Sequence, residues 1–181
     1  MEVISRLNQK TKFTRMCISE AIVALLKNTD FGRLKISDIV KKAGVARASF
    51  YKYYDSPYAA LTDYLQIIIA EYVDANKAHA KSKFLEYEHI LFSLQFFDKY
   101  VNYFLTLAKC KLHGIMLDGI NRFMAENVQT GRKMTIYELY SYAGGLLNSF
   151  LKWEESGKKE SAEDVAMAIY NMYSPENHSL E

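Results

Sequence analysis

The chain of 181 residues has few prolines and cysteines: Pro57, Pro175, Cys17 and Cys110. Because proline interrupts helices and central strands, so low a number leaves room for long, regular elements. Two cysteines that lie far apart in sequence do not make a disulfide framework. We therefore expect the protein to work in a reducing compartment, the cytoplasm.

Long apolar runs are also missing. The longest apolar stretches, such as LQIIIA, fall far short of the ~18 residues that a membrane-spanning helix needs. The first residues, MEVISRLNQKTKFTR, contain no apolar core of a secretory signal peptide. We therefore expect no membrane partner.

The residues that an enzyme or a metal site would need are scattered. The four histidines, His79, His89, His113 and His178, lie apart in sequence. Cys110 lies three residues before His113, but two ligands do not make a metal site. Neither a glycine-rich phosphate loop nor a nucleophile elbow is present. The sequence therefore predicts no enzymatic activity, no metal and no cofactor.

Charge is distributed unevenly, although the net charge is only +2. Residues 1–54 carry eleven Lys and Arg against four Asp and Glu, whereas residues 55–181 carry twelve against seventeen. This division favours a basic domain that binds a polyanion, followed by an acidic domain that a polyanion would repel. The alternative is that the basic side chains form an ordinary solvated face.

Nearly every segment has helical periodicity, and no stretch alternates as a strand would. We predict an all-α fold of about nine helices: a three-helix head over residues 1–54 and a helical body over residues 55–181. The helices that can be delimited best cover residues 12–28, 47–53, 135–155 and 161–173, and a further helix is expected between Ser37 and Gly44.

Residues at the ends of these segments predict where helices start and stop. Ser37 is the expected N-cap of the second helix, and Gly44 is expected to end it in the left-handed conformation. Ser56 is expected to cap the fourth helix, with Pro57 at its first position. Ser161 with Asp164 has the spacing of a capping motif at the last helix.

The order of helix, short turn beginning with Gly44, and helix is that of a helix-turn-helix, whose second helix enters the DNA major groove. Phe50 and Tyr54 lie four residues apart and are expected to pack against the first helix of the pair. An arginine near the start of the second helix, Arg47, can reach base edges. The alternative is two core helices that are joined by a glycine turn.

The segment LLKNTDFGRLKISDIVKKAGVARASFYKYYDSPYAAL closely resembles the N-terminal domain of TetR-family transcriptional regulators, whose pattern is IA..AGVS.GT.Y.HF.SK..L. The matching residues are Ile36, Ser37, Ile39, Ala43, Gly44, Val45, Arg47, Ser49, Phe50, Tyr51, Tyr54 and Ser56. The chain departs from the pattern at Ala46, which replaces a capping Ser, and at Pro57, which replaces a phosphate-contacting Lys.

The resemblance implies a ligand-responsive repressor that binds a palindromic operator in double-stranded DNA as a homodimer. It also implies a C-terminal domain that binds a small effector and dimerises through its last two helices. The candidate DNA-binding residues are Ser37, Arg47, Ala48, Ser49, Tyr51, Lys52 and Tyr53. Of these, Tyr51 and Lys52 are placed to contact phosphates, which position the protein without reading sequence.

The helix expected over residues 135–155 carries an apolar stripe broader than one neighbouring helix requires. The candidate dimer contacts on it are Tyr140, Ala143, Gly144, Leu147 and Phe150. Two adjacent glycines cost a helix roughly 1 kcal/mol each, which a close helix approach could offset. The alternative is a kink or a helix crossing within the chain. At the end of this helix, Glu154 and Lys158 are expected to form a solvated i,i+4 pair.

The body is also rich in aromatic residues. Its candidate effector contacts are Phe96, Tyr100, Tyr103, Phe104, Met116 and Phe123. Ligand pockets are mostly apolar, so these residues could line one, but they could equally form a filled core. A different function stays open as well: because of Ala46 and Pro57, the protein could be a helical co-regulator that acts mainly through a protein partner, with weak or no direct DNA binding.

Overall fold

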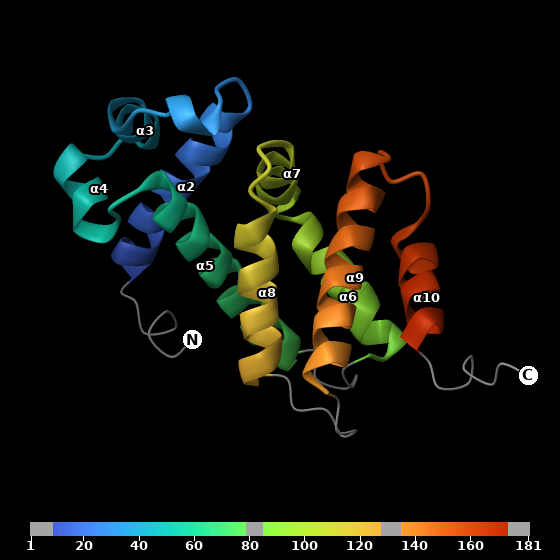
Figure 1. The fold of residues 1–181 in the computed structure, drawn as a ribbon. Helices are drawn as coiled ribbons and strands as arrows, with labels where there is room; N and C mark the ends of the chain where they lie inside the picture. The colour runs from blue at the N-terminus through green and yellow to red at the C-terminus, as the bar shows by residue number, and fades with distance from the viewer. Residues whose placement is uncertain (1–8, 79–84, 128–134, 174–181) are drawn as a thin grey trace, which may run out of the picture. The chain divides into compact units, whose positions relative to one another are not determined.

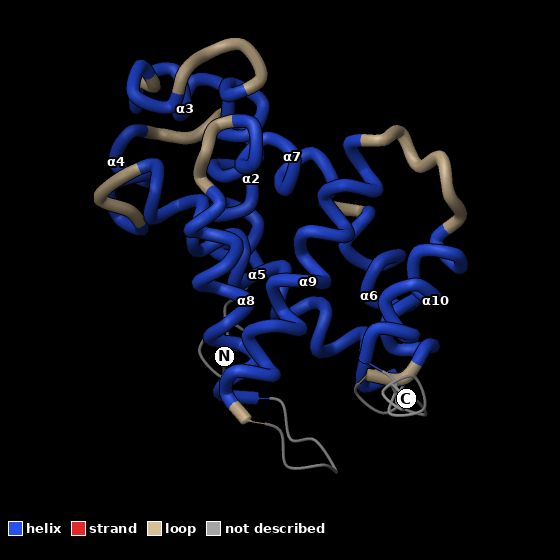
Figure 2. The backbone as a smooth tube through the Cα atoms, turned by 45° about the vertical axis from the view of Figure 1, so that its right-hand side comes forward, coloured by secondary structure: helices blue, strands red, loops and turns tan. Residues whose placement is uncertain are grey.

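The computed structural model describes residues 9–78, 85–127 and 135–173. These residues form nine α-helices and one short 3-10 helix and contain no strand, so the all-α prediction is confirmed (Figures 1 and 2). The helices are α2 (Gln9–Leu26), α3 (Ile36–Ala43), α4 (Arg47–Tyr53), α5 (Pro57–Ala78), α6 (Tyr87–Asp98), α7 (Val101–Lys109), α8 (His113–Asn127), α9 (Ile136–Glu155) and α10 (Ala162–Tyr173).

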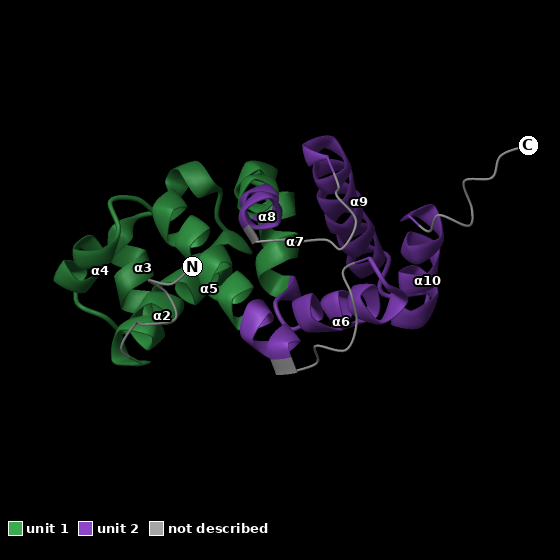
Figure 3. Ribbon diagram, turned by 90° about the horizontal axis from the view of Figure 1, so that it is seen from below, with its two compact units in different colours: residues 1–71, 102–119 green, residues 72–101, 120–181 purple. Residues whose placement is uncertain are grey.

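The chain divides into two compact units (Figure 3). The first unit comprises residues 1–71 and 102–119, and the second comprises residues 72–101 and 120–181. Helix α5 contributes residues to both units. The predicted functional boundary at residue 54 falls inside the first unit and stays a prediction.

Most of the predicted helix ends are confirmed. Gly44 ends α3 with φ 66°, and the Val45 amide donates to the Val40 carbonyl at 3.0 Å, which is the bond of a Schellman motif. The Ser56 hydroxyl accepts from the Ala59 amide at 3.2 Å, one residue before α5 starts at Pro57.

The N-cap predicted at Ser37 is wrong. Helix α3 starts two residues earlier than predicted, so Lys35 holds the cap position and Ser37 lies inside the first turn. The Lys35 side chain makes no capping bond, whereas its carbonyl accepts from the amides of Asp38 and Ile39 at 3.0 and 3.1 Å. The extended backbone of Lys35 turns into the helix before the serine is reached, so the residue of the preferred type is not the one at the boundary.

The core of the first unit contains the apolar faces of α2, α3, α4 and α5. Ile18, Ile39, Phe50 and Leu61 are fully buried there. Helix α7 joins this core, because the Tyr103 hydroxyl donates to the Leu61 carbonyl at 2.9 Å. At Gly119, α8 approaches α5 so closely that a Cβ would lie 2.4 Å from Leu65 Cδ2.

Replacing Gly119 with alanine should therefore destabilise the protein. Leu65 is fully buried, and overpacking of this kind costs about 1–3 kcal/mol. Gly114 provides the matched control, because it lies on the same helix and a Cβ there would meet nothing within 4 Å. Urea denaturation should show a lower unfolding free energy for Gly119→Ala and no loss for Gly114→Ala. Equal values for the two variants would contradict the close contact.

The turn between α9 and α10 contains a charged cluster in place of the solvated pair that was expected. Glu154 is only 8% exposed, and Lys158 lies beyond the helix end with φ 57°. The Lys158 ammonium pairs with Asp98 of α6 and lies 3.5 Å from Glu154 Oε1. Burial, and then the charge of Asp98, raise the pKa of the Glu154 carboxyl. The expectation of a surface pair failed because α6, remote in sequence, covers this turn.

The cluster predicts a pH-dependent effect for Lys158→Met. Without the ammonium, the pKa of Glu154 rises further, so the folded state binds protons more readily than the unfolded state. Stability is then lost as the pH rises through this folded pKa, and the loss is absent below the unfolded value of about 4.3. We expect a loss of about 1 kcal/mol at pH 7, kept small because Lys158 is partly exposed. Denaturant titrations at pH 4 and pH 7 measure it, and Lys159→Met removes the same charge from an exposed neighbouring position. Equal losses for the two variants at pH 7 would contradict the cluster.

Candidate nucleic-acid interface

Helix α4 is the second helix of the predicted helix-turn-helix, and its bounds are those that the sequence predicts. It follows Ala46, whose extended backbone offers no side-chain cap, and it ends at Tyr54, where the backbone is extended with φ −140° and ψ 140°. The carbonyl of Ala46 accepts from the Ser49 amide at 2.9 Å, so backbone bonds alone start the helix.

The buried face of α4 contains the two aromatic residues that the sequence assigns to it. Phe50 is fully buried, and Tyr54 is buried at the end of the helix. Their ring centroids lie 5.9 Å apart in an edge-on arrangement. Both residues are buried as their predicted packing requires, and packing against α3 itself stays a prediction.

The opposite face of α4 holds the candidate DNA contacts. Arg47, Ala48, Tyr51 and Lys52 are exposed, and Ser49 is half-buried. Tyr53 is half-buried too, and the Lys52 ammonium lies 5.4 Å from the centroid of its ring. Ser37 is exposed on α3. The structure thus presents these side chains to solvent from two adjacent helices of one unit.

One pairing on this face was missed from the sequence. Arg47 Nη2 donates to the Tyr51 hydroxyl at 3.2 Å, and the guanidinium carbon of Arg47 lies 5.6 Å from the centroid of the Tyr51 ring. The i,i+4 spacing of the two residues was the available signal, because such residues are neighbours on a helix surface. Tyr51 therefore holds the residue that is predicted to reach the bases.

Further positive charge surrounds this face. Lys41 and Lys42 are exposed in the last turn of α3, where cations interact favourably with the helix dipole, and Lys35 is exposed just before α3. Acidic side chains are present too: Asp38 and Asp55 are both exposed. The sequence predicted a basic segment, and the structure shows that part of its charge lies on α3.

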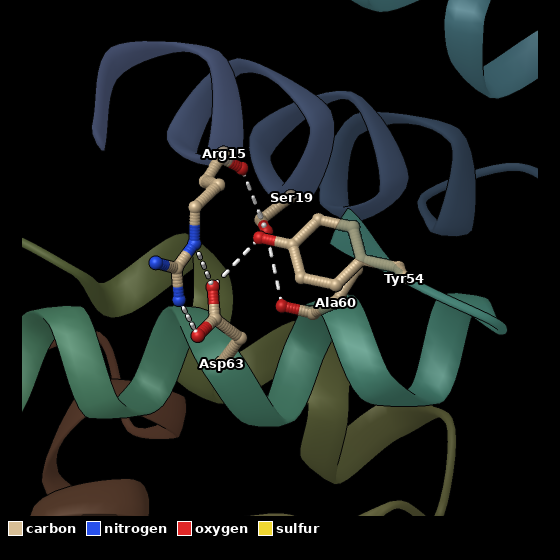
Figure 4. A network of polar contacts seen from close by, with 5 residues as sticks. All are labelled: Arg15, Ser19, Tyr54, Ala60 and Asp63. Carbon is tan, nitrogen blue, oxygen red and sulfur yellow. Dashed lines mark hydrogen bonds and ion pairs between the residues drawn. The ribbon is translucent and has the colours of Figure 1, made fainter. Parts of the chain in front are cut away.

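A polar network fixes the C-terminal end of α4 (Figure 4). The Tyr54 hydroxyl donates to Asp63 Oδ2 of α5 at 2.6 Å. Arg15 of α2 donates to the same oxygen from Nε at 2.9 Å and to Oδ1 from Nη2. Burial, and then the bond to Asp63, raise the pKa of the Tyr54 hydroxyl, so it stays protonated and acts as a donor. Tyr54 and Arg15 lie far apart in sequence, and no local pattern indicated that they share one carboxylate.

The candidate effector residues do not lie in one unit. Tyr103, Phe104 and Met116 are buried in the first unit, whereas Phe96, Tyr100 and Phe123 belong to the second.

In the second unit aromatic side chains gather around Tyr72, which was not singled out from the sequence. Its ring stacks on Phe97 with centroids 5.0 Å apart, and Phe96 meets it edge-on at 5.4 Å. The Tyr72 hydroxyl lies 2.9 Å from both His89 Nε2 and Ser93 Oγ, and the Ser93 hydroxyl donates to the His89 carbonyl at 2.7 Å. Polar groups that orient one another are therefore buried among aromatic rings.

The candidate dimer residues divide by exposure. Ala143, Leu147 and Phe150 are buried within the monomer, whereas Tyr140 is 45% exposed and a Cβ on Gly144 would meet nothing within 4 Å. The neighbouring glycine, Gly145, has a different role: the Tyr173 hydroxyl of α10 would lie 2.7 Å from a Cβ there. For Gly145 the alternative of a helix crossing within the chain is correct.

Residues 18–57 match the family model described as bacterial regulatory proteins, tetR family. Over this segment the chain is similar to the TetR family. The match covers the helix-turn-helix and the start of α5. No curated protein matches this chain in sequence.

Solved structures share the fold over nearly the whole chain. Lin0861 from Listeria innocua superposes with a TM-score of 0.73 at 13% identity, covering 92% of each chain. A TetR transcriptional regulator from Streptococcus agalactiae 2603V gives a TM-score of 0.58 at 17% identity, covering 91% of this chain and 95% of the other. The regulator FadR from Bacillus subtilis in complex with stearoyl-CoA gives 0.56 at 13% identity, covering 87% and 96%.

In the described parts of the chain, a membrane-spanning helix and a metal site are both absent. None of the helices there is both long and apolar enough to cross a membrane. Within the same residues, no three His, Cys, Asp or Glu side chains gather where they could hold a metal ion.

Proposed function

We propose that this protein is a TetR-family transcriptional repressor that binds a palindromic operator as a homodimer and releases it when a small ligand binds. The observation that carries the proposal is the two-sided α4. Phe50 and Tyr54 anchor one face in the core, and the other face exposes Arg47, Tyr51 and Lys52 beside the basic end of α3.

On this proposal α4 lies in the major groove, where some of its residues contact bases and others contact phosphates. Arg47 donates to a base edge, most often guanine, and the small Ala48 and Ser49 allow close approach. Lys52, Tyr51 and Tyr53 contact phosphates, as does Ser37 at the start of α3. Pro57 stands where the family pattern has a phosphate-contacting lysine. We propose that the exposed Lys41 and Lys42 of α3 supply the positive charge in its place.

This division between base and phosphate contacts predicts different effects for two substitutions. Arg47→Ala should cost about 1–3 kcal/mol of binding free energy and relax the preference at one base position. Lys52→Ala should weaken binding to all sequences alike and reduce the salt slope by about 1. Selection of bound genomic fragments with the purified protein, followed by titration of one fragment in several salt concentrations, measures both. Lys152→Ala on α9 is the control for loss of charge alone. Unchanged binding in both head variants would contradict the assignment of α4.

The second unit supplies the homodimer contact on this proposal. Its last two helices expose large apolar side chains, and a folded monomer rarely exposes several of them together. These are Ile136, Tyr137, Tyr140, Met167 and Met172. A dimer would also present two copies of α4 to half-sites about 34–36 Å apart.

The effector is proposed to bind in the second unit, beside the aromatic residues around Tyr72. Phe96, Tyr100 and Phe123 are the candidates there, and Tyr103, Phe104 and Met116 of the first unit are weaker ones. The stearoyl-CoA bound by FadR from Bacillus subtilis makes acyl-CoA thioesters the first compounds to test. A ligand should raise Tm and lower operator affinity together, and free CoA and stearate separate the two parts of the molecule.

The same titrations test the alternative hypothesis, a helical co-regulator that acts mainly through a protein partner. Ala46 provides no side-chain cap to α4, which is the observation that favours it. Binding that depends on phosphates weakens steeply as salt rises, because counterions are released from DNA. A protein that captures no DNA at low salt would support the co-regulator in place of the repressor.

A further inference from the structure

We propose that Asp63 is the positioning residue of helix α4, because it holds the end of that helix and the middle of α2 in one polar network (Figure 4). The proposed DNA binding is needed only for the functional consequence. The network itself lies within the first unit.

The Asp63 carboxylate is used on both oxygens. Oδ2 accepts from the Tyr54 hydroxyl at 2.6 Å and from Arg15 Nε at 2.9 Å, and Oδ1 accepts from Arg15 Nη2. A fork of two parallel bonds fixes the orientation of a guanidinium as well as its distance. Both charged side chains are largely buried, so solvent screens the pair less than it screens a surface pair.

Helix α5, which carries Asp63, also forms hydrogen bonds with α2 at neighbouring positions. The Ser19 hydroxyl, which is fully buried, lies 3.0 Å from the Ala60 carbonyl, to which it donates. Three residues after Ala60, Asp63 of α5 pairs with Arg15 of α2. At the next residue of α5, the Tyr64 hydroxyl donates to Glu20 Oε1 of α2 at 3.1 Å. Asp63 is therefore one of several residues that join α2 and α5 through hydrogen bonds.

A seven-residue helix needs such a second attachment. Phe50 anchors α4 near its middle and the Tyr54 ring is buried at its end, but the packing of apolar rings is non-directional and does not by itself fix the position of that end. The bond from Tyr54 fixes the C-terminal end as well, so two fixed points define the direction of the helix axis. This direction decides which base edges the exposed face can reach.

The hydroxyl of Tyr54 is not required for packing. The family pattern has Phe where this chain has Tyr54, so an aromatic ring alone can fill the position. The added hydroxyl finds a carboxylate two turns into α5, at a distance short for a neutral donor. Tyr54→Phe therefore removes the attachment and keeps the ring in the core.

The experiment compares the full-length protein with Tyr54→Phe, Asp63→Asn and the control Asp74→Asn, which removes the same charge from an exposed position on α5. Amide hydrogen exchange over residues 47–54, measured without DNA, reports how firmly α4 is held. Titrations with a selected DNA fragment and with random DNA report its alignment. A fourth variant, Arg15→Met with Tyr54→Phe and Asp63→Leu, replaces the network by apolar groups, which often preserves stability.

We expect exchange over residues 47–54 to be about tenfold faster in Tyr54→Phe and Asp63→Asn, and unchanged in Asp74→Asn. Affinity for the selected fragment should fall about tenfold, while affinity for random DNA and the salt slope stay within about twofold. The apolar variant should be as stable as the wild type and still bind poorly.

Three results would overturn the proposal: wild-type exchange in Tyr54→Phe and Asp63→Asn, an equal effect in Asp74→Asn, or full binding by the apolar variant. Wild-type protein that selects no DNA would overturn the proposed function instead. Exchange over residues 47–54 would then still decide the role of Asp63.

Discussion

Replacing Phe50 with alanine should cost about 3–5 kcal/mol of unfolding free energy, the range measured for removing a buried aromatic side chain. The ring is fully buried. Its centroid lies 5.6 Å from that of the Tyr51 ring and 5.9 Å from that of the Tyr54 ring, both in edge-on arrangements. Its loss leaves a cavity between α4 and the core, and the helix on which DNA binding is proposed to depend loses its central anchor.

Tyr51→Ala is the matched control for this substitution. Tyr51 is the next aromatic residue on the same helix, but it is 52% exposed. Its replacement should change the unfolding free energy by less than about 1 kcal/mol, since surface substitutions usually have small effects. Chemical denaturation monitored by circular dichroism measures both variants. A similar loss in the two would show that α4 does not pack through one face.

The contrast between Phe50 and Tyr51 was predictable from sequence because it depends only on helical geometry. Residues four apart share a face, so a helix over residues 47–53 with Phe50 turned inward must turn Tyr51 outward. The left-handed end at Gly44 and the start of α5 at Pro57 were predictable for the same reason: backbone restrictions of single residues decide them.

The residues that were missed depend on contacts between distant segments. Asp63 receives Arg15 and Tyr54 only because α2, α4 and α5 pack together, and an aspartate within a helix carries no signal of this. Glu154 appeared solvated because its neighbour Asp98 lies on another helix. The candidate effector residues shared an aromatic character along the chain, but periodicity does not say which unit each helix joins. The structure places three of them in each.

Ser37 shows a limit of local chemistry as well. Serine is a preferred N-cap, but the cap is defined by where the backbone turns into the helix, and that happens at Lys35. Ser37 is exposed on α3 whichever residue is the cap, so the role proposed for Ser37 does not depend on this two-residue error.

Tyr140→Asp should convert the proposed homodimer into monomers. Tyr140 lies on the exposed side of α9 beside Gly144, while Ala143 and Leu147 face the core of their own unit. A carboxylate buried unpaired in an interface costs about 2–5 kcal/mol, so the dimer Kd should rise roughly 30-fold to several thousandfold. The monomer should keep its stability, because in the single chain this side chain is already in water.

Tyr58→Asp is the control, since Tyr58 is a tyrosine of equal exposure, 45%, in the first turn of α5. Sedimentation velocity over a range of concentrations should show dimers for the wild type and for Tyr58→Asp, and monomers for Tyr140→Asp. The monomeric variant should also lose affinity for a two-half-site fragment while keeping weak affinity for one half-site, because each α4 then binds alone. A wild-type chain that sediments as a monomer, or a Tyr140→Asp variant that remains dimeric with an unchanged Kd, would place the interface elsewhere than on the exposed side of α9.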